Sequence, residues 1–178
     1  TYLASMITGQ FTGQVFEKLI YNENLQNRNI DYVFANAIEN GGGIINSLGL
    51  TKIYILATNA SASASEGLIN GLSPYIEVIH IGTNTTGKTQ ASNLFYDSPN
   101  FSRQGANPAH RYVLQPLIAI GSNKNNETVP GTGLPPSIGF EYEERLLNLG
   151  VIGDVDEPML ALAIADIENS TSKRNLIK

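Results

Sequence analysis

A serine and a lysine in this chain lie in two short motifs that could support nucleophilic catalysis. Ser63 lies in the segment Asn59–Glu66, which reads Asn-Ala-Ser-Ala-Ser-Ala-Ser-Glu, and Lys88 ends the segment Gly82–Lys88, which reads Gly-Thr-Asn-Thr-Thr-Gly-Lys. The two residues are 25 positions apart. A serine hydroxyl can attack a carbonyl carbon when a neutral lysine takes its proton, so such a pair needs no histidine.

Ser63 is expected at a turn between a strand and a helix, where two interpretations of it stay open. In the first, Ser63 is the N-cap of the helix and Glu66 completes a capping box, which involves no chemistry. In the second, the hydroxyl stands between two alanines that leave room for a substrate backbone, as in the nucleophile elbow of other hydrolases. The amide of Ala64 would then lie at the helix N-terminus and could stabilise an oxyanion.

Lys88 also has two interpretations. A lysine in a glycine-bounded loop is most often a solvated surface residue. To act as a base, Lys88 would have to be buried and neutral at working pH, because removal from water disfavours the charged ammonium. It could then accept the proton of Ser63 Oγ and later donate it to the leaving amine.

The lysine motif also fits the phosphate-binding loop pattern G-x-x-x-x-G-K-S/T over Gly82–Thr89. That pattern requires a helix that begins at the lysine, because the helix N-terminus holds the phosphates. The following residues, 90–99, contain turn formers and reach Pro99 early, and no apolar strand ending in an aspartate for magnesium is evident. A P-loop nucleotide-binding protein is therefore a less favoured interpretation.

Other polar residues offer less specific alternatives. His80 and His110 are the only histidines, and either could complete a Ser-His-Asp triad, although His80 is expected to be held in a strand by packing or a hydrogen bond. Glycines 41–43 could form an anion-binding nest, but a hairpin turn is preferred. A solvated charged face is expected for three further residues: Glu141, Glu143 and Glu144.

The composition indicates one acidic domain with a sizeable core. The chain has 178 residues, of which 42% are hydrophobic, and a formal net charge of −5. These values argue against disorder, and against nucleic acid or an anionic membrane surface as the main partner. No apolar run reaches membrane-spanning length, and no signal peptide is visible. The lack of cysteine excludes disulfides and thiolate zinc sites.

A strand–helix–strand unit is expected to position the serine and the lysine. The runs 52–57 and 76–81 are short and nearly all apolar, as is typical of buried central strands. The helix between them begins at Ser63 and stops before Pro74. These lengths predict a βαβ unit with parallel strands.

The remaining elements are expected on both sides of this unit. The pattern predicts a helix from Thr1 to about Gly9 and another over 158–168. Residues 121–139 are rich in Gly, Pro and Asn, and they are predicted to form a long loop. Further strands are predicted at four places: residues 15–21, 32–37, 93–96 and 112–120.

These residues together resemble the carboxyl-terminal processing peptidases, also called tail-specific proteases. In that family the catalytic serine lies three residues before a glutamate and the catalytic lysine follows 25 residues after the serine, as Ser63, Glu66 and Lys88 do here. The wider resemblance, to Bacteroidetes-type members, covers most of the chain. Four further segments carry it: residues 19–22, 69–75, 94–99 and 156–160.

The resemblance implies an α/β fold with a partial crotonase-like core of ββα units, parallel central strands and flanking helices. It implies endoproteolysis near the C-termini of proteins by a Ser63–Lys88 dyad, with the Ala64 amide as an oxyanion donor and no metal or organic cofactor. Protein or peptide C-terminal tails are the implied partners, nucleic acid is not, and the oligomeric state stays open. The implied location is the bacterial periplasm or cell envelope, with a lipid anchor as an option for the full-length protein.

Two departures from the family pattern lower the expected activity. Many members have a glutamine four residues after the lysine that orients it; here that position is Ser92, the candidate orienting residue, and Gln90 lies two residues earlier. Members also have an upstream Asn-Gly-Gly strand that completes the oxyanion hole, a PDZ domain and a signal segment, and none of these is expected within residues 1–178. The chain is therefore expected to be a single domain, the C-terminal part of a protease domain, and weak or inactive alone.

A non-catalytic peptide-binding module of the same fold is the alternative from another functional class. Such a module would need neither an activated Ser63 nor a neutral Lys88. Substitution of Ser63 by alanine separates the two, because binding would survive in a module and acyl-enzyme formation would vanish in a protease.

Overall fold

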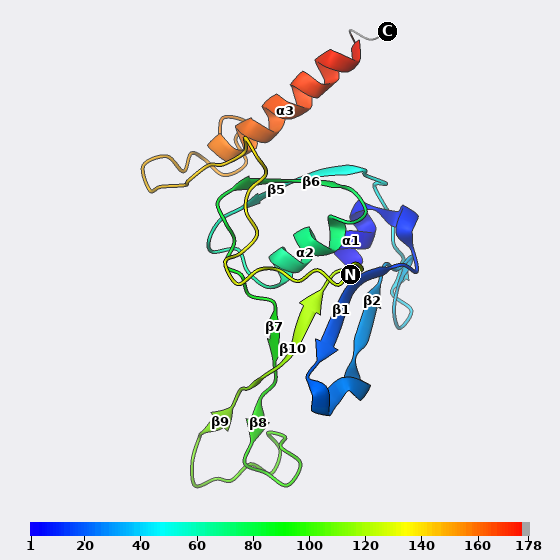
Figure 1. Ribbon diagram of the computed structural model, residues 1–178, viewed down its shortest axis with the longest axis vertical. Coiled ribbons are helices and arrows are strands. Elements are labelled where there is room, and N and C mark those ends of the chain that lie inside the picture. Colours follow the sequence, from blue (N-terminus) through cyan, green and yellow to red (C-terminus); the bar gives the residue numbers. More distant parts are fainter. Residues whose placement is uncertain (176–178) are drawn as a thin grey trace.

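A four-stranded antiparallel sheet forms one layer of the molecule in the computed structural model, which describes residues 1–175 and their side chains as far as residue 169 (Figure 1). Its strands, in spatial order, are β2 (Ile30–Val33), β1 (Val15–Tyr21), β10 (Leu117–Ser122) and β7 (Gln90–Ser92). The strand predicted over 15–21 is confirmed at both ends. β7 lies at the edge of this sheet, directly after the lysine motif.

A parallel pair of strands, β5 (Lys52–Ala57) and β6 (Glu77–Gly82), forms a second layer. Helix α2 (Ala64–Leu72) connects the two strands and contacts both β6 and the antiparallel strands β1 and β10, so it lies between the layers (Figure 1). The predicted βαβ unit is therefore confirmed. Its register pairs every residue of β5 with the residue 25 positions later in the chain, from Lys52 with Glu77 to Ala57 with Gly82.

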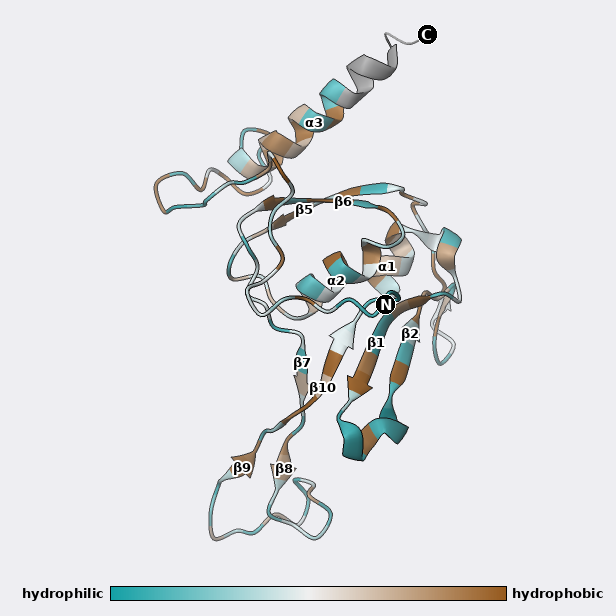
Figure 2. Ribbon diagram, viewed as in Figure 1, coloured by the Kyte–Doolittle hydropathy of each residue, from teal (hydrophilic) through white to brown (hydrophobic). Residues whose placement is uncertain are grey.

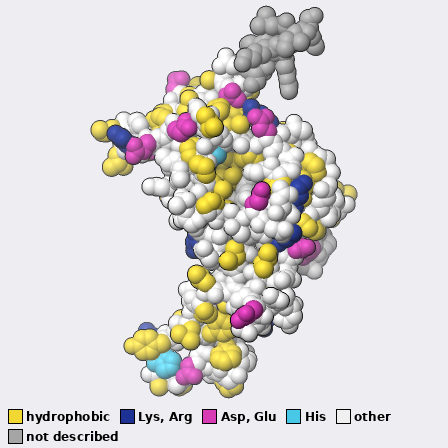
Figure 3. All heavy atoms as spheres, in the orientation of Figure 1, with side chains coloured by type: hydrophobic (Ala, Val, Ile, Leu, Met, Phe, Trp, Pro, Cys, Tyr) yellow, Lys and Arg dark blue, Asp and Glu magenta, His cyan; other side chains and the backbone are white. Residues whose placement is uncertain are grey.

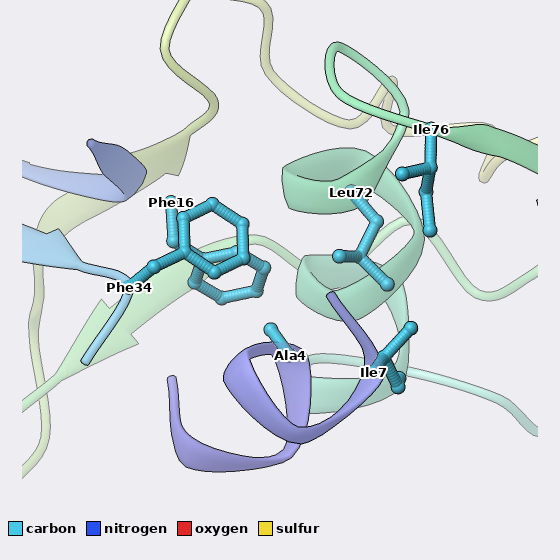
Figure 4. Packing of buried hydrophobic residues seen from close by; sticks show 6 residues of the cluster. All are labelled: Ala4, Ile7, Phe16, Phe34, Leu72 and Ile76. Carbon is cyan, nitrogen blue, oxygen red and sulfur yellow. The ribbon is translucent and has the colours of Figure 1, made fainter. Parts of the chain in front are cut away.

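The main core lies between α1 (Tyr2–Ile7), α2 and β1 (Figure 4). Phe34 packs edge-on against Phe16, with ring centroids 5.4 Å apart, and against Tyr75 at 5.0 Å. Gly71 allows this packing, because a Cβ at that position would lie 2.5 Å from the Phe16 ring. The packing fixes the position of α2 and thus of its first turn. The buried cluster consists of Ala4, Ile7, Phe16, Phe34, Leu72 and Ile76.

Helix α3 (Pro158–Asn175) covers the other side of the parallel pair. Its residues Met159 and Ala163 pack with Ile81 of β6 in a second buried cluster, and Figure 2 shows hydrophobic residues along β5, β6 and the first turns of α3. Lys52 Nζ lies 3.0 Å from Asp166 Oδ2, and Tyr54 donates a hydrogen bond to the same oxygen. The helix is thus held to β5 by both apolar and charged contacts.

An arm formed by residues 93–116 projects from the ends of β7 and β10 (Figure 1). It contains β8 (Phe95–Tyr96) and β9 (Val113–Leu114), which pair with each other. Hydrophobic side chains gather on its surface (Figure 3), among them Tyr112 at 86% exposure. The remaining elements are the hairpin of β3 (Ala37–Ile38) and β4 (Gly43–Ile44) and the 3-10 helices η1 (Gly9–Phe11) and η2 (Glu23–Arg28).

The mixed α/β class is confirmed, but several predicted boundaries are wrong. The strand expected over 32–37 is β2, which begins at Ile30 and ends at Val33. The strand expected over 112–120 is divided at Pro116, which cannot donate a ladder hydrogen bond, into β9 and β10. The strand expected over 93–96 keeps only Phe95–Tyr96, and the helix expected over 158–168 continues to Asn175. None of the helices in residues 1–175 has the length and apolar character needed to span a membrane.

Candidate active site

The parallel register of β5 and β6 sets the serine beside the lysine. Ala57 pairs with Gly82 at the ends of the two strands. Ser63 lies six residues beyond Ala57, and Lys88 lies six residues beyond Gly82. The serine turn and the lysine loop therefore leave the same edge of the strand pair with equal lengths. The serine–lysine spacing of 25 in the sequence equals the register offset of the strands.

Ser63 has an uncommon backbone conformation. Its φ is 55° and its ψ is −109°, at the position before the first residue of α2, and its side chain is exposed. An N-cap serine ordinarily has an extended backbone, and a positive φ in a non-glycine residue costs of order 1–3 kcal/mol. The capping-box prediction is confirmed for Glu66, which accepts a hydrogen bond from Ser63 N at 2.9 Å. Capping alone does not require this strained turn, and a strained strand-to-helix turn also presents the serine of the nucleophile elbow in other proteins.

The carboxylate of Glu66 connects the serine turn to the lysine loop. One oxygen accepts hydrogen bonds from Ser63 N and Lys88 N, both at 2.9 Å. The other accepts from Thr85 Oγ1 and Gly87 N, both at 2.6 Å. The side chain is completely buried. Burial by itself would raise the pKa of Glu66, but the hydrogen bonds from Thr85, Gly87, Lys88 and Ser63 hold that pKa below its ordinary value.

Thr86 adds two bonds between the same segments. Its amide donates to Ser61 O at 2.9 Å, and its hydroxyl donates to Asn59 O at 2.8 Å. Ser61 Oγ in turn accepts a hydrogen bond from Thr58 N at 3.1 Å. The turn that presents Ser63 is therefore held by the lysine loop as well as by its own bonds.

Part of the long loop predicted over 121–139 packs onto the lysine loop. Thr85 N donates to Leu134 O at 3.0 Å, and Leu134 N donates to Thr85 Oγ1 at 2.8 Å. The backbones are so close that a Cβ at Gly133 would lie 1.9 Å from Thr85 O, and a Cβ at Gly87 would lie 2.4 Å from Gly131 O. This loop thus supports the segment that carries Lys88.

A cavity of about 270 Å³ lies beside the serine turn, and its lining includes Ser63, Ala64 and Lys88. The first amides of an α-helix have no acceptor within the helix, so Ala64 N–H, at the first position of α2, is available to a group in this cavity. The structure therefore brings together the predicted nucleophile, base and oxyanion donor. The cavity is also lined by Glu17, Leu19, Gly67, Ala91, Ser122 and Val129.

Ser92 lies outside this cavity, whereas Gln90 lines it. Both residues belong to β7, and Ser92 Oγ accepts a hydrogen bond from Gln115 Nε2 at 2.9 Å. The candidate orienting residue is therefore bonded to the base of the arm rather than to Lys88.

Lys88 is exposed, as its interpretation as a solvated loop residue expects, whereas its interpretation as a buried base does not match this structure. Its backbone amide donates to Glu66. Among the residues that the structure describes, Lys88 Nζ forms no hydrogen bond or ion pair.

The structure does not form the phosphate-binding loop that the lysine motif could also indicate, and it places His80 in a strand. After Lys88 the chain enters strand β7 rather than a helix, and Glu66 occupies the amides of Gly87 and Lys88 that a phosphate would need, so the phosphate-loop geometry is not formed. His80 is buried in β6 with Nδ1 2.9 Å from Pro135 O, as expected of a strand histidine.

Three other sets of candidates also lie apart from the cavity. His110 pairs with Asp97 on the arm. Gly41 and Gly42 lie in the β3–β4 hairpin turn, as preferred, and Gly43 begins β4. Glu143 pairs with Arg145 in an exposed ion pair. Within the described residues no group of three acidic or histidine side chains could hold a metal ion.

Two residues of the site were missed from the sequence. The sequence predicts Glu66 as a helix-cap residue and as a marker of the serine motif, but a glutamate three residues into a helix gives no signal that it also binds a loop 21 residues away. Glu17 lines the cavity from β1, far from both motifs in sequence, and nothing in its surroundings along the chain indicates this.

No protein-family model matches the sequence, and no curated protein matches it. Solved structures do. A protein of Bacteroides fragilis NCTC 9343 assigned as an S41 protease is 26% identical, with a TM-score of 0.75, over 94% of this chain and 40% of that chain. A photosystem II D1 C-terminal processing protease is 16% identical, with a TM-score of 0.53, over 88% of this chain and 33% of that chain.

A third solved structure, a lipoprotein from Streptococcus agalactiae, is 15% identical, with a TM-score of 0.51, over 82% of this chain and 44% of that chain. The last two similarities concern the fold alone. The chain spans less than half the length of each of these proteins. The resemblance to carboxyl-terminal processing peptidases that the motifs indicated is confirmed by this set of neighbours.

Proposed function

We propose that the chain is part of a serine endopeptidase of the carboxyl-terminal processing type, with Ser63 as nucleophile and Lys88 as general base. One observation carries the proposal: Ser63, Ala64 and Lys88 line the same cavity, and Ser63 lies in a strained turn at the start of α2. The 26% identity to an S41 protease over 94% of the chain supports the same reaction class.

The geometry suits a two-step acyl transfer. Ser63 Oγ attacks the carbonyl carbon of a peptide bond while its proton passes to Lys88 Nζ, and Ala64 N–H donates to the oxygen that gains negative charge. The tetrahedral intermediate collapses to an acyl-enzyme, and the departing amine takes the proton from Lys88. Water then hydrolyses the ester, again with Lys88 accepting a proton, and Ser63 is regenerated.

The exposed side chain of Lys88 would be covered by the substrate. A peptide bound across the cavity would separate Lys88 from bulk water and place it beside the reacting groups. Ser92 could orient Lys88 only after exchanging its bond with Gln115.

The proposal extends to the surroundings of the site. Residues 1–178 would be the C-terminal part of a larger protease domain with a crotonase-like core, consistent with the 40% of the S41 protease that the chain covers. Its substrates would be the C-terminal tails of proteins, and a glycine amide from upstream would complete the oxyanion hole. A place in the bacterial cell envelope agrees with the fold similarity to a lipoprotein.

A non-catalytic peptide-binding module of the same fold is the second candidate. The exposed side chain of Lys88, which has no partner among the described residues, is the observation that favours it. A module would bind peptide tails in the same cavity and would leave them intact.

Labelling with a fluorophosphonate or peptide boronate probe, read by intact mass, tests the proposal. We expect one adduct at Ser63, none in Ser63→Ala, and labelling slowed by roughly 100-fold or more in Lys88→Met, the usual contribution of a general base. Ser65→Ala, which removes a second exposed serine of the same turn, should label like the wild type. Absence of any adduct, with peptide binding retained, would reject the protease and favour the module.

A further inference from the structure

Strand β1 has a bulge that turns two consecutive side chains towards α2. Its register with β2 shifts between Val15 and Glu17, so an extra residue is accommodated there. In a regular strand Phe16 and Glu17 would point to opposite faces. Here a Cβ on Gly71 of α2 would lie 2.5 Å from the Phe16 ring, and a Cβ on Gly67 would lie 3.5 Å from Glu17 Oε1. Bulges commonly redirect a side chain in this way beside active sites.

Glycines on two elements make room for the Glu17 carboxylate. Besides Gly67 on α2, Gly121 on β10 faces it, and a Cβ there would lie 2.8 Å from Glu17 Oε1. The side chain is half-buried and forms no hydrogen bond or ion pair with any side chain that the structure describes. Burial raises the pKa of Glu17.

This carboxylate lies in the cavity that contains the nucleophile. Gly67 follows Ser63 by four residues, a rise of about 6 Å in a helix, and both residues line the cavity. Apolar walls come from Leu19, Ala91 and Val129. The cavity thus combines apolar walls with an acid about one turn from the serine.

The carboxylate of Glu17 offers a ligand in the cavity a hydrogen-bond acceptor and a negative charge. Glu17 forms no ion pair among the described residues, and a carboxylate pairs best with a cationic N–H donor.

We propose that Glu17 determines substrate specificity, selecting a lysine or arginine side chain next to the scissile bond. This inference rests on the proposed peptidase function. The methylenes of the side chain would pack on Leu19, Ala91 and Val129, and its cationic end would pair with Glu17. Lys88 lines the same cavity but forms no ion pair with Glu17, so the carboxylate is available to the substrate.

Matched active-site probes test this assignment. Two peptidyl phosphonates that differ only in the residue beside the phosphorus, lysine in one and norleucine in the other, are compared by rate of adduct formation at Ser63. We expect the lysine probe to react at least about tenfold faster, because a charge-assisted pair in a sheltered site contributes that much or more. In Glu17→Gln the ratio should fall to about one while the norleucine rate stays near that of the wild type.

Glu23→Gln, which removes an exposed carboxylate on η2, is the matched control and should keep the lysine preference. Equal rates for the two probes in the wild type would overturn the role of Glu17 and leave the peptidase proposal standing. A preference that survives Glu17→Gln would also overturn it. Failure of both probes to react with Ser63 would reject the peptidase and the specificity together.

Discussion

Ser63 has a backbone conformation that glycine adopts at lower cost. With φ at 55°, the serine stores strain, and glycine at an N-cap position loses only a few tenths of a kcal/mol in capping. We therefore expect Ser63→Gly to stabilise the protein by about 1 kcal/mol while it abolishes labelling by serine-directed probes. Urea unfolding monitored by circular dichroism measures the change.

Ser63→Ala is the control for this substitution, because it removes the same hydroxyl and keeps the strain. It should be no more stable than the wild type. A Ser63→Gly variant that is less stable than Ser63→Ala would contradict the idea that the turn stores strain for function.

Glu66 should be the most sensitive residue of the site. Each of its oxygens accepts two hydrogen bonds, so Glu66→Gln turns an NH2 group towards two backbone or hydroxyl donors. Leaving two such buried donors unsatisfied should cost about 3 kcal/mol of unfolding free energy, and labelling of Ser63 should slow with it. Urea unfolding gives the cost, and Glu23→Gln, with its exposed carboxylate, should change stability by less than about 0.5 kcal/mol.

The same carboxylate makes stability depend on pH in a defined direction. Because its pKa in the folded protein is below the ordinary 4.5, its contribution is complete well above pH 4.5 and is lost as the pH falls through the lowered folded value. Wild-type protein should lose stability across this acidic range by more than Glu66→Gln does. Parallel acid titrations of both proteins in urea measure it, and equal losses would show that Glu66 is not the titrating group.

At the scale of residues, the sequence predicted the candidate groups of the site but not their connections. Ser63, Ala64 and Lys88 were predicted because local motifs fix their positions. The bonds of Glu66 to the lysine loop and the entry of Glu17 into the cavity depend on tertiary packing and on a strand bulge, and neither leaves a local pattern.

At the scale of elements, the support of the lysine loop by the loop at 130–135 can be tested with two glycines. A Cβ at Gly133 would lie 1.9 Å from Thr85 O, at a φ of 83°, so Gly133→Ala should cost about 3 kcal/mol and slow labelling at Ser63. Gly131 has nothing within 4 Å of an added Cβ, so Gly131→Ala should stay within about 0.5 kcal/mol of the wild type. Thermal melts of both variants compare them, and equal losses would reject the packing argument.

Strands and helices with a strong hydrophobic pattern were predictable from the sequence. Element boundaries were less predictable where a proline or a polar stretch interrupts that pattern. Short apolar runs identified β5 and β6, and the capping residues identified the start of α2. Pro116 divides the strand expected over 112–120, and the polar residues after Glu168 continue α3 despite their weak apolar pattern. The antiparallel four-stranded sheet joins strands about 100 residues apart, such as Lys18 with Ser122, and local pattern cannot give that pairing.

At the scale of the whole molecule, we expect weak turnover from the 178 residues alone. The chain spans 40% of the S41 protease to which it is similar, and the second oxyanion donor is proposed to lie in the remainder. Loss of one such donor typically slows acyl transfer by roughly 100- to 1000-fold. A fluorogenic peptide with a free C-terminus measures turnover, with Ser63→Ala as the blank. Rapid, Ser63-dependent turnover would show that residues 1–178 form a complete site.

The shared register of β5 and β6 governs how this sequence can change in length. A residue inserted beside the exposed Ser73, in the turn between α2 and β6, would lengthen the count between serine and lysine yet leave both strand ends and both connecting segments unchanged. A residue inserted between Ala57 and Ser63, or between Gly82 and Lys88, would displace one reactive group relative to the other. Insertions and deletions in related chains should therefore accumulate in the turn near Ser73 and avoid the segments 57–63 and 82–88. The number of residues between the serine and the lysine is then set by the strand connections and not by the chemistry.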